Sequence, residues 1–228
     1  MSKLKIQPTK LEDFIDRILM DVPYSFSRFG DGEWNAIFRK PGSNCDDHQY
    51  FPEMGARLEN AVLEPYAYDY GMQGLALRTQ GFEIQEMMEG SHIEWLNADV
   101  FHKAFSQGMM GHMVQALKTK KVCLVGPLYL KDRRMKFLTT GGIVKVPIKD
   151  CYQDIDRVRG EILRNQSAEV FAFSCSMMAN VLIHELFPYI GTEKWLIDFG
   201  SVWDPCVDRP TRTVHKTYSP ELIERNLG

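Results

Sequence analysis

The chain has 228 residues, of which 44% are hydrophobic and 25% are charged, and its formal net charge is −3. This composition is typical of a globular protein with an ordinary core and argues against a disordered chain. The slightly acidic balance argues against a broad basic face for nucleic acid, and no apolar run approaches the roughly 20 residues that a membrane-spanning helix needs.

The N-terminal residues and the cysteines favour a reducing compartment. The first ten residues, MSKLKIQPTK, lack the apolar core of a signal peptide. The cysteine count is odd and no C-x-x-C occurs, so neither a disulfide framework nor a zinc knuckle is indicated. We therefore expect a cytoplasmic protein. The five cysteines are Cys45, Cys123, Cys151, Cys175 and Cys206.

The first elements in chain order are a helix and then a strand, a turn and a second helix. Thr9 and Glu12 have the spacing of a capping box ahead of an apolar helical stripe that ends near Asp21. Residues 24–38 read YSFSRFGDGEWNAIF. Alternating apolar residues over 24–29 predict a strand, Gly30 and Gly32 mark a turn, and the spacing after Glu33 is helical.

Two carboxylates, Asp31 and Glu33, lie in that turn, and Arg28 precedes it. Carboxylate oxygens are ligands that Mg²⁺ and Mn²⁺ prefer, and these ions usually complete their shell with substrate phosphates. The planar guanidinium of Arg28 suits a phosphate. The alternative is a structural role, because acidic residues also satisfy the free N–H groups and the dipole at a helix start.

The middle of the chain is less regular. Residues 40–51 are predicted to be a solvated loop, with Asp46, Asp47 and His48 as the alternative metal ligands. A helix over 53–63 and a short strand over 70–77 follow. Residues 81–119 are rich in Met, His and aromatic side chains and predict a helical insertion. That segment is a candidate for an acceptor-facing wall or for a contact in a homo-oligomer.

The remainder alternates apolar strands with helices. Strands are predicted from residue 120 to Gly126 and Pro127, and over 141–148, 169–173 and 195–199. Near-continuous apolar strands that alternate with helices indicate a parallel sheet with helices on both faces. We therefore expect an α/β, Rossmann-like, mostly parallel sheet in a single domain that spans residues 1–228.

Ligands of open α/β sheets bind beyond the carboxyl ends of the strands. Four turns are predicted there: 30–33, 126–127, 174–176 and 200–204. Ser174 and Ser176 precede a helix, whose N-terminus is suited to an anion, although plain N-capping explains them as well. A diphosphate at these serines and a metal at the 30–33 turn would form a nucleotide-diphosphate pocket.

The last predicted turn supplies candidates for acid–base chemistry. Asp198 and Asp204 are the candidate general bases for an acceptor hydroxyl, with Asp204 preferred and a buried structural role as the alternative for Asp198. Trp203 either stacks on a sugar or base or is simply packed. Gly200 and Ser201 complete the candidate nucleotide-sugar contacts.

The segment SFSRFGDGEW resembles the signature of the GT-D type glycosyltransferases, formerly a domain of unknown function. The hallmark of that family is R-[FY]-G-D-G-E, whose D-x-E carboxylates serve a divalent metal. The match here consists of Arg28, Phe29, Gly30, Asp31, Gly32 and Glu33. A second, weaker resemblance comprises Met178, Ala179, Val181 and Leu182, followed by Asp198, Phe199 and Gly200. The chain departs from the family's glycine-rich turn by having Ser-Cys-Ser at 174–176.

The resemblance implies a GT-D fold and a metal-dependent transfer of sugar from a nucleotide-diphosphate donor, UDP-linked in the first instance, to a glycan hydroxyl. Manganese or magnesium is the implied cofactor. One alternative acceptor is a hydroxymethylated base of phage DNA, for which Lys131, Arg133, Arg134 and Lys136 form a basic cluster. A non-catalytic nucleotide-binding module is the other alternative. No P-loop, G-x-G-x-x-G or G-x-S-x-G motif supports a kinase, a dinucleotide oxidoreductase or a hydrolase.

Overall fold

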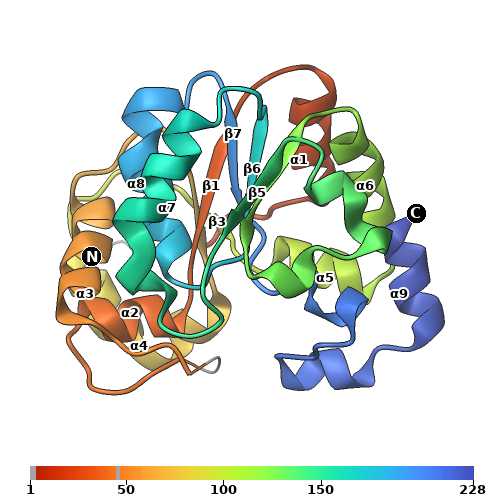
Figure 1. The fold of residues 1–228 in the computed structure, drawn as a ribbon. Coiled ribbons are helices and arrows are strands. Elements are labelled where there is room, and N and C mark those ends of the chain that lie inside the picture. The colour runs from red at the N-terminus through yellow and green to blue at the C-terminus, as the bar shows by residue number, and fades with distance from the viewer. Residues whose placement is uncertain (1–3, 45–46) are drawn as a thin grey trace.

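A computed structural model of the chain describes residues 4–44 and 47–228, so Cys45 and Asp46 lie outside the described residues. Its centre is one parallel, seven-stranded sheet with the strand order β3-β2-β1-β7-β6-β4-β5 (Figure 1). The strands are β1 (Ser25–Phe29), β2 (Asp69–Met72), β3 (Trp95–Asn97), β4 (Val122–Gly126), β5 (Gly142–Lys145), β6 (Val170–Phe173) and β7 (Trp195–Asp198).

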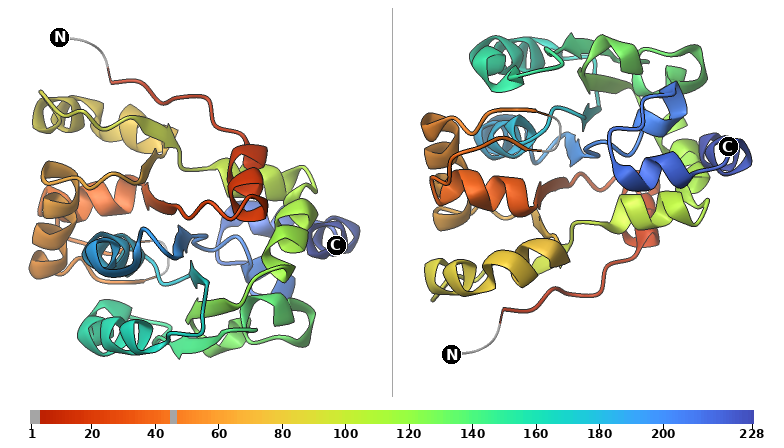
Figure 2. Two further views of the ribbon diagram at one scale, coloured as in Figure 1. Left: turned by 90° about the horizontal axis from the view of Figure 1, so that it is seen from above. Right: turned by 90° about the horizontal axis from the view of Figure 1, so that it is seen from below.

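Helices cover both faces of this sheet, and the two end-on views in Figure 2 show the three layers. The helices of one face are α2 (Asp31–Ile37), α3 (Pro52–Leu63), α4 (Gly74–Met87), α7 (Ile155–Arg164) and α8 (Met178–Ile190). Those of the other are α1 (Leu11–Leu19), α5 (Val100–Ser106), α6 (Met110–Lys118) and α9 (Pro220–Leu227). Short 3₁₀ helices lie between them: η1 (Leu128–Leu130), η2 (Arg133–Leu138), η3 (Cys151–Asp154), η4 (Asp204–Val207) and η5 (Thr213–Thr217).

The pleat of each strand divides its side chains between two hydrophobic cores. Phe26 of β1 packs in the core on the α1 side, whereas Phe29 packs in the core on the α2 side. Both side chains are fully buried. Burying a phenylalanine stabilises a fold by about 1.5–3 kcal/mol. The predicted α/β fold with a parallel sheet and helices on both faces is confirmed.

The segment 81–119 is not an insertion, which corrects the sequence-based expectation. Part of α4 and all of β3, α5 and α6 lie in it, and β3 pairs in parallel with β2 as the edge strand. Helices α5 and α6 complete the core on the α1 side of the sheet. The strand was missed because three residues, Trp95–Asn97, are too short to give a periodic pattern.

Two smaller expectations also change. The strand expected over 70–77 ends at Met72, and α4 begins at Gly74. Thr9 does not cap α1: the N–H of Lys10 donates to Asp13 Oδ2 (3.1 Å) instead, while Thr9 Oγ1 accepts a hydrogen bond from the N–H of Asn97 (2.8 Å). Thr9 therefore ties the start of α1 to the edge strand. In the described part of the chain, no helix combines the length and the apolar character needed to cross a membrane.

Candidate functional site

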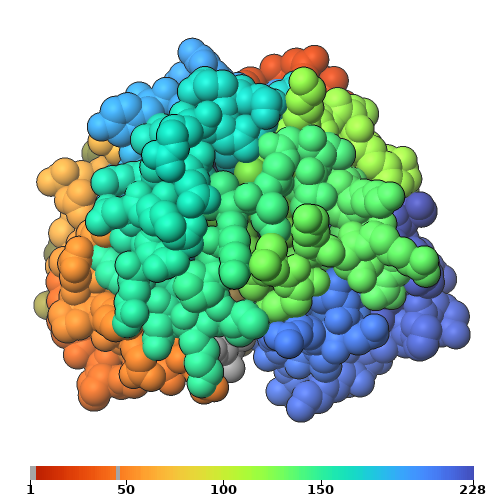
Figure 3. Space-filling view, viewed as in Figure 1, coloured from red at the N-terminus to blue at the C-terminus, as the bar shows by residue number. Residues whose placement is uncertain are grey.

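A pocket of about 730 Å³ lies at the carboxyl ends of the strands. All four turns that the sequence predicted to meet there contribute to its wall: residues 30–33 after β1, Pro127 after β4, 174–176 after β6 and part of 200–204 after β7. In Figure 3 this edge faces downward, where the surface is hollowed between the orange and teal segments on one side and the blue C-terminal segment on the other. The predicted convergence of these turns is therefore confirmed.

The acidic wall of the pocket is the first turn of α2. Gly30 is the N-cap residue, and its N–H donates to Glu33 Oε2 at 2.7 Å. A Cβ at Gly30 would fall 2.4 Å from Gln73 Oε1, so glycine leaves room for the Gln73 side-chain amide. Asp31 and Glu33 both line the pocket, and Asp31 is exposed.

Glu33 is half-buried, and its environment disfavours the charged form. Burial raises the pKa of this carboxyl from its usual value near 4.5 to about 7, against the opposing hydrogen bond from the Gly30 N–H. The nearby carboxylate of Asp198 acts in the same direction as burial, and Arg28 acts against it. A cation placed beside Glu33 would offset this penalty, because an opposite charge favours the ionised carboxylate.

The donor set fits a Mg²⁺ or Mn²⁺ ion that is shared with a substrate. The described residues hold no group of three or more His, Cys, Asp or Glu side chains that could enclose a metal. Residues two apart in a helix do not face each other, so Asp31 and Glu33 do not form a closed cage. Mg²⁺ is usually held by one or two carboxylates together with phosphates and water. The acidic wall therefore suits a metal only if the ligand completes the shell.

Arg28 lies at the floor of the pocket in an ion pair with Asp198. Its Nε is 3.2 Å from Asp198 Oδ2, and its Nη1 donates to the carbonyl of Ala98 (3.4 Å). Asp198 Oδ1 accepts from the N–H of Gly200 at 2.8 Å. Burial raises the pKa of Asp198 and the Arg28 guanidinium lowers it. These bonds fit the structural role that the sequence left open for Asp198, and its role as a base stays a prediction.

The Ser-Cys-Ser turn lines the pocket, but its serines do not cap α8. The helix begins at Met178 and has no side-chain cap. Ser176 has a φ of +54° and its Oγ accepts from Asn44 Nδ2 (2.6 Å), whereas the buried Ser174 Oγ has no hydrogen-bond partner among the described residues. The N-capping alternative is therefore wrong for both serines.

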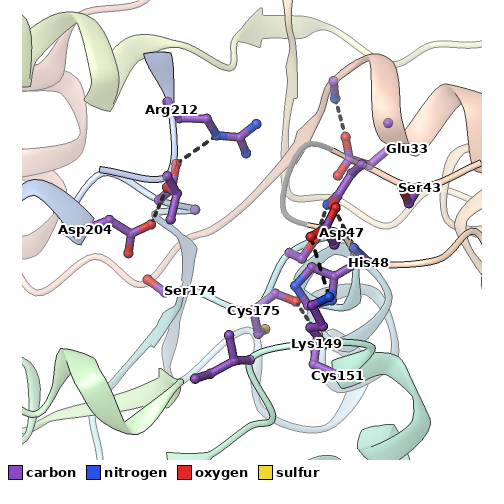
Figure 4. A pocket seen from close by; sticks show the side chains of 18 of the residues that line it. Glu33, Ser43, Asp47, His48, Lys149, Cys151, Ser174, Cys175, Asp204 and Arg212 are labelled. Atoms are coloured by element: carbon purple, nitrogen blue, oxygen red, sulfur yellow. Dashed lines mark hydrogen bonds and ion pairs between the residues drawn. The ribbon is translucent and has the colours of Figure 1, made fainter. Parts of the chain in front are cut away.

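The wall opposite to α2 comes from the loop after β7 and from η1. Asp204, which is 3% exposed, accepts from Tyr129 Oη at 3.2 Å and from Thr211 Oγ1 at 2.6 Å. Arg212 Nε donates to Ser201 Oγ at 3.2 Å. Figure 4 shows Asp204 and Arg212 on one side of the pocket and Glu33, Ser43, Asp47 and His48 on the other.

Three of the predicted binding residues lie away from the pocket surface. Trp203 is fully buried and packs against Phe137 (5.4 Å between ring centroids) and Phe199 (5.5 Å), so it cannot stack on a sugar in this structure. Phe29 is equally buried in the core, and Gly126 does not line the cavity. These three are supporting residues, because the pleat and the loop path turn them toward the cores.

Several pocket residues were not identified from the sequence. Tyr129 and Lys149 lie three and four residues after the ends of β4 and β5. They would have been identified if a few more residues after each strand had been counted as candidates for the site. Arg209, Thr211 and Arg212 gave no signal, because they lie in a charged tail well past the end of β7. The 40–51 loop, expected to be solvated, brings Ser43, Asn44, Asp47, His48 and Tyr50 to the pocket.

The basic cluster at 131–136 lies in and beside η2, and none of its four basic side chains lines the pocket. Arg134 pairs with Asp132 (3.2 Å) and reaches Asp208 (3.7 Å). These pairings offset part of the positive charge that a nucleic-acid backbone would need. The cluster therefore lends no support to a DNA acceptor.

No protein-family model matches this sequence, and no curated protein matches it. Solved structures are similar to it. One is described as the highly conserved domain of unknown function 1792, with a distinct glycosyltransferase fold. It is 16% identical, with a TM-score of 0.65 over 88% of this chain and 79% of that one.

Two further structures give the same result. A new glycosyltransferase (DUF1792) from Streptococcus sanguinis is 16% identical, with a TM-score of 0.63 over 87% of this chain and 82% of that one. A selenomethionine-substituted DUF1792 structure is 15% identical, with a TM-score of 0.63 over 88% and 79%. At this level of identity the similarity shows the fold. The chain thus has the DUF1792 glycosyltransferase fold that the RFGDGE segment implied.

Proposed function

We propose that this protein is a metal-dependent glycosyltransferase that moves a sugar from a nucleotide-diphosphate donor, in the first instance a UDP-sugar, to a hydroxyl group of a glycan. The observation that carries the proposal is the position of Asp31 and Glu33. Both line the pocket at the carboxyl ends of the strands, in a fold shared with DUF1792 glycosyltransferases. Two carboxylates with no third protein ligand among the described residues suit an ion that a diphosphate completes.

The transfer breaks the bond between the anomeric carbon and a diphosphate oxygen and forms a bond from the acceptor oxygen to that carbon. Negative charge develops on the leaving diphosphate. A Mg²⁺ or Mn²⁺ ion at Asp31 and Glu33 would supply positive charge beside it. Arg28 adds positive charge at the pocket floor, although its ion pair with Asp198 offsets part of that charge.

The acceptor hydroxyl must also lose its proton. Asp204 and Asp198 are the two carboxylates that the sequence offered as bases, and both line the pocket. Each already accepts hydrogen bonds, Asp198 from Arg28 and Gly200, and Asp204 from Tyr129 and Thr211. Since hydrogen bonds to a carboxylate stabilise its ionised form and weaken it as a base, either residue must exchange a partner to accept the proton.

The test is a screen of UDP-, GDP-, CDP-, ADP- and dTDP-sugars for release of nucleoside diphosphate with Mg²⁺ or Mn²⁺ and with EDTA. We expect release from at least one donor that requires the metal, and a loss of at least about 100-fold in Asp31→Asn and in Glu33→Gln, the order expected when one electrostatic contact to a transition state is removed. Glu59→Gln, which removes a carboxylate outside the pocket, serves as the matched control.

Other outcomes would point elsewhere. Tight nucleotide binding without turnover of any donor would favour a non-catalytic binding module. Transfer of labelled sugar to hydroxymethylcytosine DNA, lost on charge reversal at Lys131, Arg133 and Arg134, would favour the DNA acceptor. Metal-independent turnover that both carboxylate variants retain would refute the proposal.

A further inference from the structure

We infer that the loop 201–212 is a second phosphate-binding wall, in which Arg209 and Arg212 contact the diphosphate of the donor from the side opposite to Asp31 and Glu33, while the buried Asp204 positions them. The inference rests on the proposed function. It goes beyond that function in two ways. The diphosphate is contacted by a metal ion on one wall of the pocket and by arginines on the other, and Asp204 has a positioning role.

Arg209 is the cation of this wall that is open to the pocket. Its guanidinium carbon lies 4.6 Å from the centroid of the Tyr129 ring, its side chain is exposed, and both residues line the cavity. No carboxylate pairs with Arg209 among residues 4–44 and 47–228. Stacking on an aromatic face holds the guanidinium plane and leaves its N–H edge for an anion.

Asp204 connects the parts of this wall. Its side chain accepts from Tyr129, whose ring supports Arg209, and from Thr211, which precedes Arg212. Its backbone carbonyl accepts from the N–H of Arg209 at 3.1 Å. Arg212 is held in turn by Ser201. A buried carboxylate bonded in this way fixes the loop before a ligand arrives, which lowers the entropy lost on binding.

The charge of the pocket explains why a second wall is needed. A divalent cation carries too little positive charge to offset two carboxylates and a diphosphate together. Arg28 is already committed to Asp198. Arginine forks match phosphate oxygens geometrically and remain charged at any working pH. Arg212 lies across the cavity from Glu33 (Figure 4), and Arg209 lines the same pocket and is bonded to Asp204 on that side. These two arginines are therefore the groups suited to the outer phosphate oxygens.

The experiment is isothermal titration calorimetry on the full chain with Mg²⁺, using the nucleoside diphosphate of the above panel that binds best and its matching nucleoside. We expect Arg209→Gln to weaken the diphosphate at least tenfold and the nucleoside less than twofold, and Arg209→Lys to be intermediate. Arg133→Gln, which removes an exposed arginine outside the pocket, is the matched control and should leave both affinities unchanged.

A diphosphate affinity of Arg209→Gln within twofold of the wild type overturns the inference even though the wild type binds. A wild type that binds no nucleoside diphosphate in Mg²⁺ refutes the proposed function, and this inference with it. For Asp204, a positioning role predicts that Asp204→Asn and Tyr129→Phe weaken the diphosphate as Arg209→Gln does, with an unchanged pH profile of kcat. Intact affinity with lost turnover in Asp204→Asn would instead make Asp204 the base, and Tyr129→Phe keeps the test available if Asp204→Asn does not fold.

Discussion

Arg28 Nε lies 3.2 Å from Asp198 Oδ2, and the two side chains are only 9% and 5% exposed. The pair joins the end of β1 to the end of β7, neighbouring strands that are far apart in the sequence. The pair lines the floor of the pocket, between the wall that contains Asp31 and Glu33 and the wall formed by the loop 201–212. Its geometry, and that of the groups around it, leads to four predictions that do not depend on knowing the donor.

Removing one partner of this buried pair should be costly. Arg28→Met leaves Asp198 buried without its cation, which typically destabilises a protein by about 3–5 kcal/mol. Urea unfolding of wild type, Arg28→Met, Asp198→Asn and the double variant measures this. We expect the double variant to be more stable than the sum of the single losses implies. Strict additivity would show that the pair is not coupled.

Gly200 should not tolerate a side chain. Its φ is +56°, and a Cβ would lie 2.1 Å from Arg28 Nη2. Gly200→Ala should therefore destabilise the fold by about 1 kcal/mol or more and shift Arg28, which reduces donor binding. The matched control is Gly81→Ala, directly after the kink at Gln80 in α4. Apart from its chain neighbours and the backbone of its own helix, no atom of the described residues lies within 4 Å of the added Cβ there. A gain of about 0.5–1 kcal/mol is expected there. Equal effects at the two positions would contradict this reading.

The raised pKa of Glu33 predicts a pH dependence of stability in the metal-free protein. The folded state holds the proton of the Glu33 carboxyl more tightly than the unfolded state does. The protonated Glu33 therefore contributes its full stabilisation of the fold below about pH 4.5, and this contribution is lost as the pH rises through about 7. Glu33→Gln removes this loss. At about 1.4 kcal/mol per pKa unit, and allowing for pocket water, we expect the variant to gain about 1–3 kcal/mol at pH 8 and little at pH 4.5.

Denaturant titrations of both proteins in EDTA across this range check the Glu33 prediction, with Glu59→Gln as the control for a partly exposed carboxylate outside the pocket. A difference that does not change with pH would count against it. The same group makes metal binding pH-dependent, because the proton must leave before the cation binds. The Mg²⁺ affinity in the presence of nucleoside diphosphate should therefore rise between pH 6 and 8.

Trp203 should affect stability and not ligand binding. It is enclosed by Phe137 and Phe199 in the core on the α1 side. Trp203→Phe should cost about 1–3 kcal/mol in thermal or chemical unfolding through lost packing. Nucleoside diphosphate affinity at a temperature where the variant is folded should equal that of the wild type. A selective loss of affinity would restore the stacking role that the sequence left open.

The apolar strands show how much of the fold can be predicted from the sequence alone. β4 and β6 are continuous apolar runs and β7 is apolar up to Asp198, a pattern typical of strands in a parallel sheet that is covered on both faces. The edge strand β3 was not predicted because three residues are too few to show a periodic pattern. Without that strand, α5 and α6 were interpreted as part of a helical insertion. The failure was therefore one of assigning these helices to a layer.

For the site, the sequence located Asp31 and Glu33 at the junction of a strand and a helix, but both residues lie in the first turn of α2 and not in a turn that precedes the helix. It also determined that the four strand-end turns meet, because parallel strands share one carboxyl edge. Only the tertiary structure decided which side chains reach the pocket. Trp203 turns into the core, while Arg209 and Arg212 enter from a loop, and a loop's path depends on contacts with distant residues such as Tyr129, which no local pattern encodes.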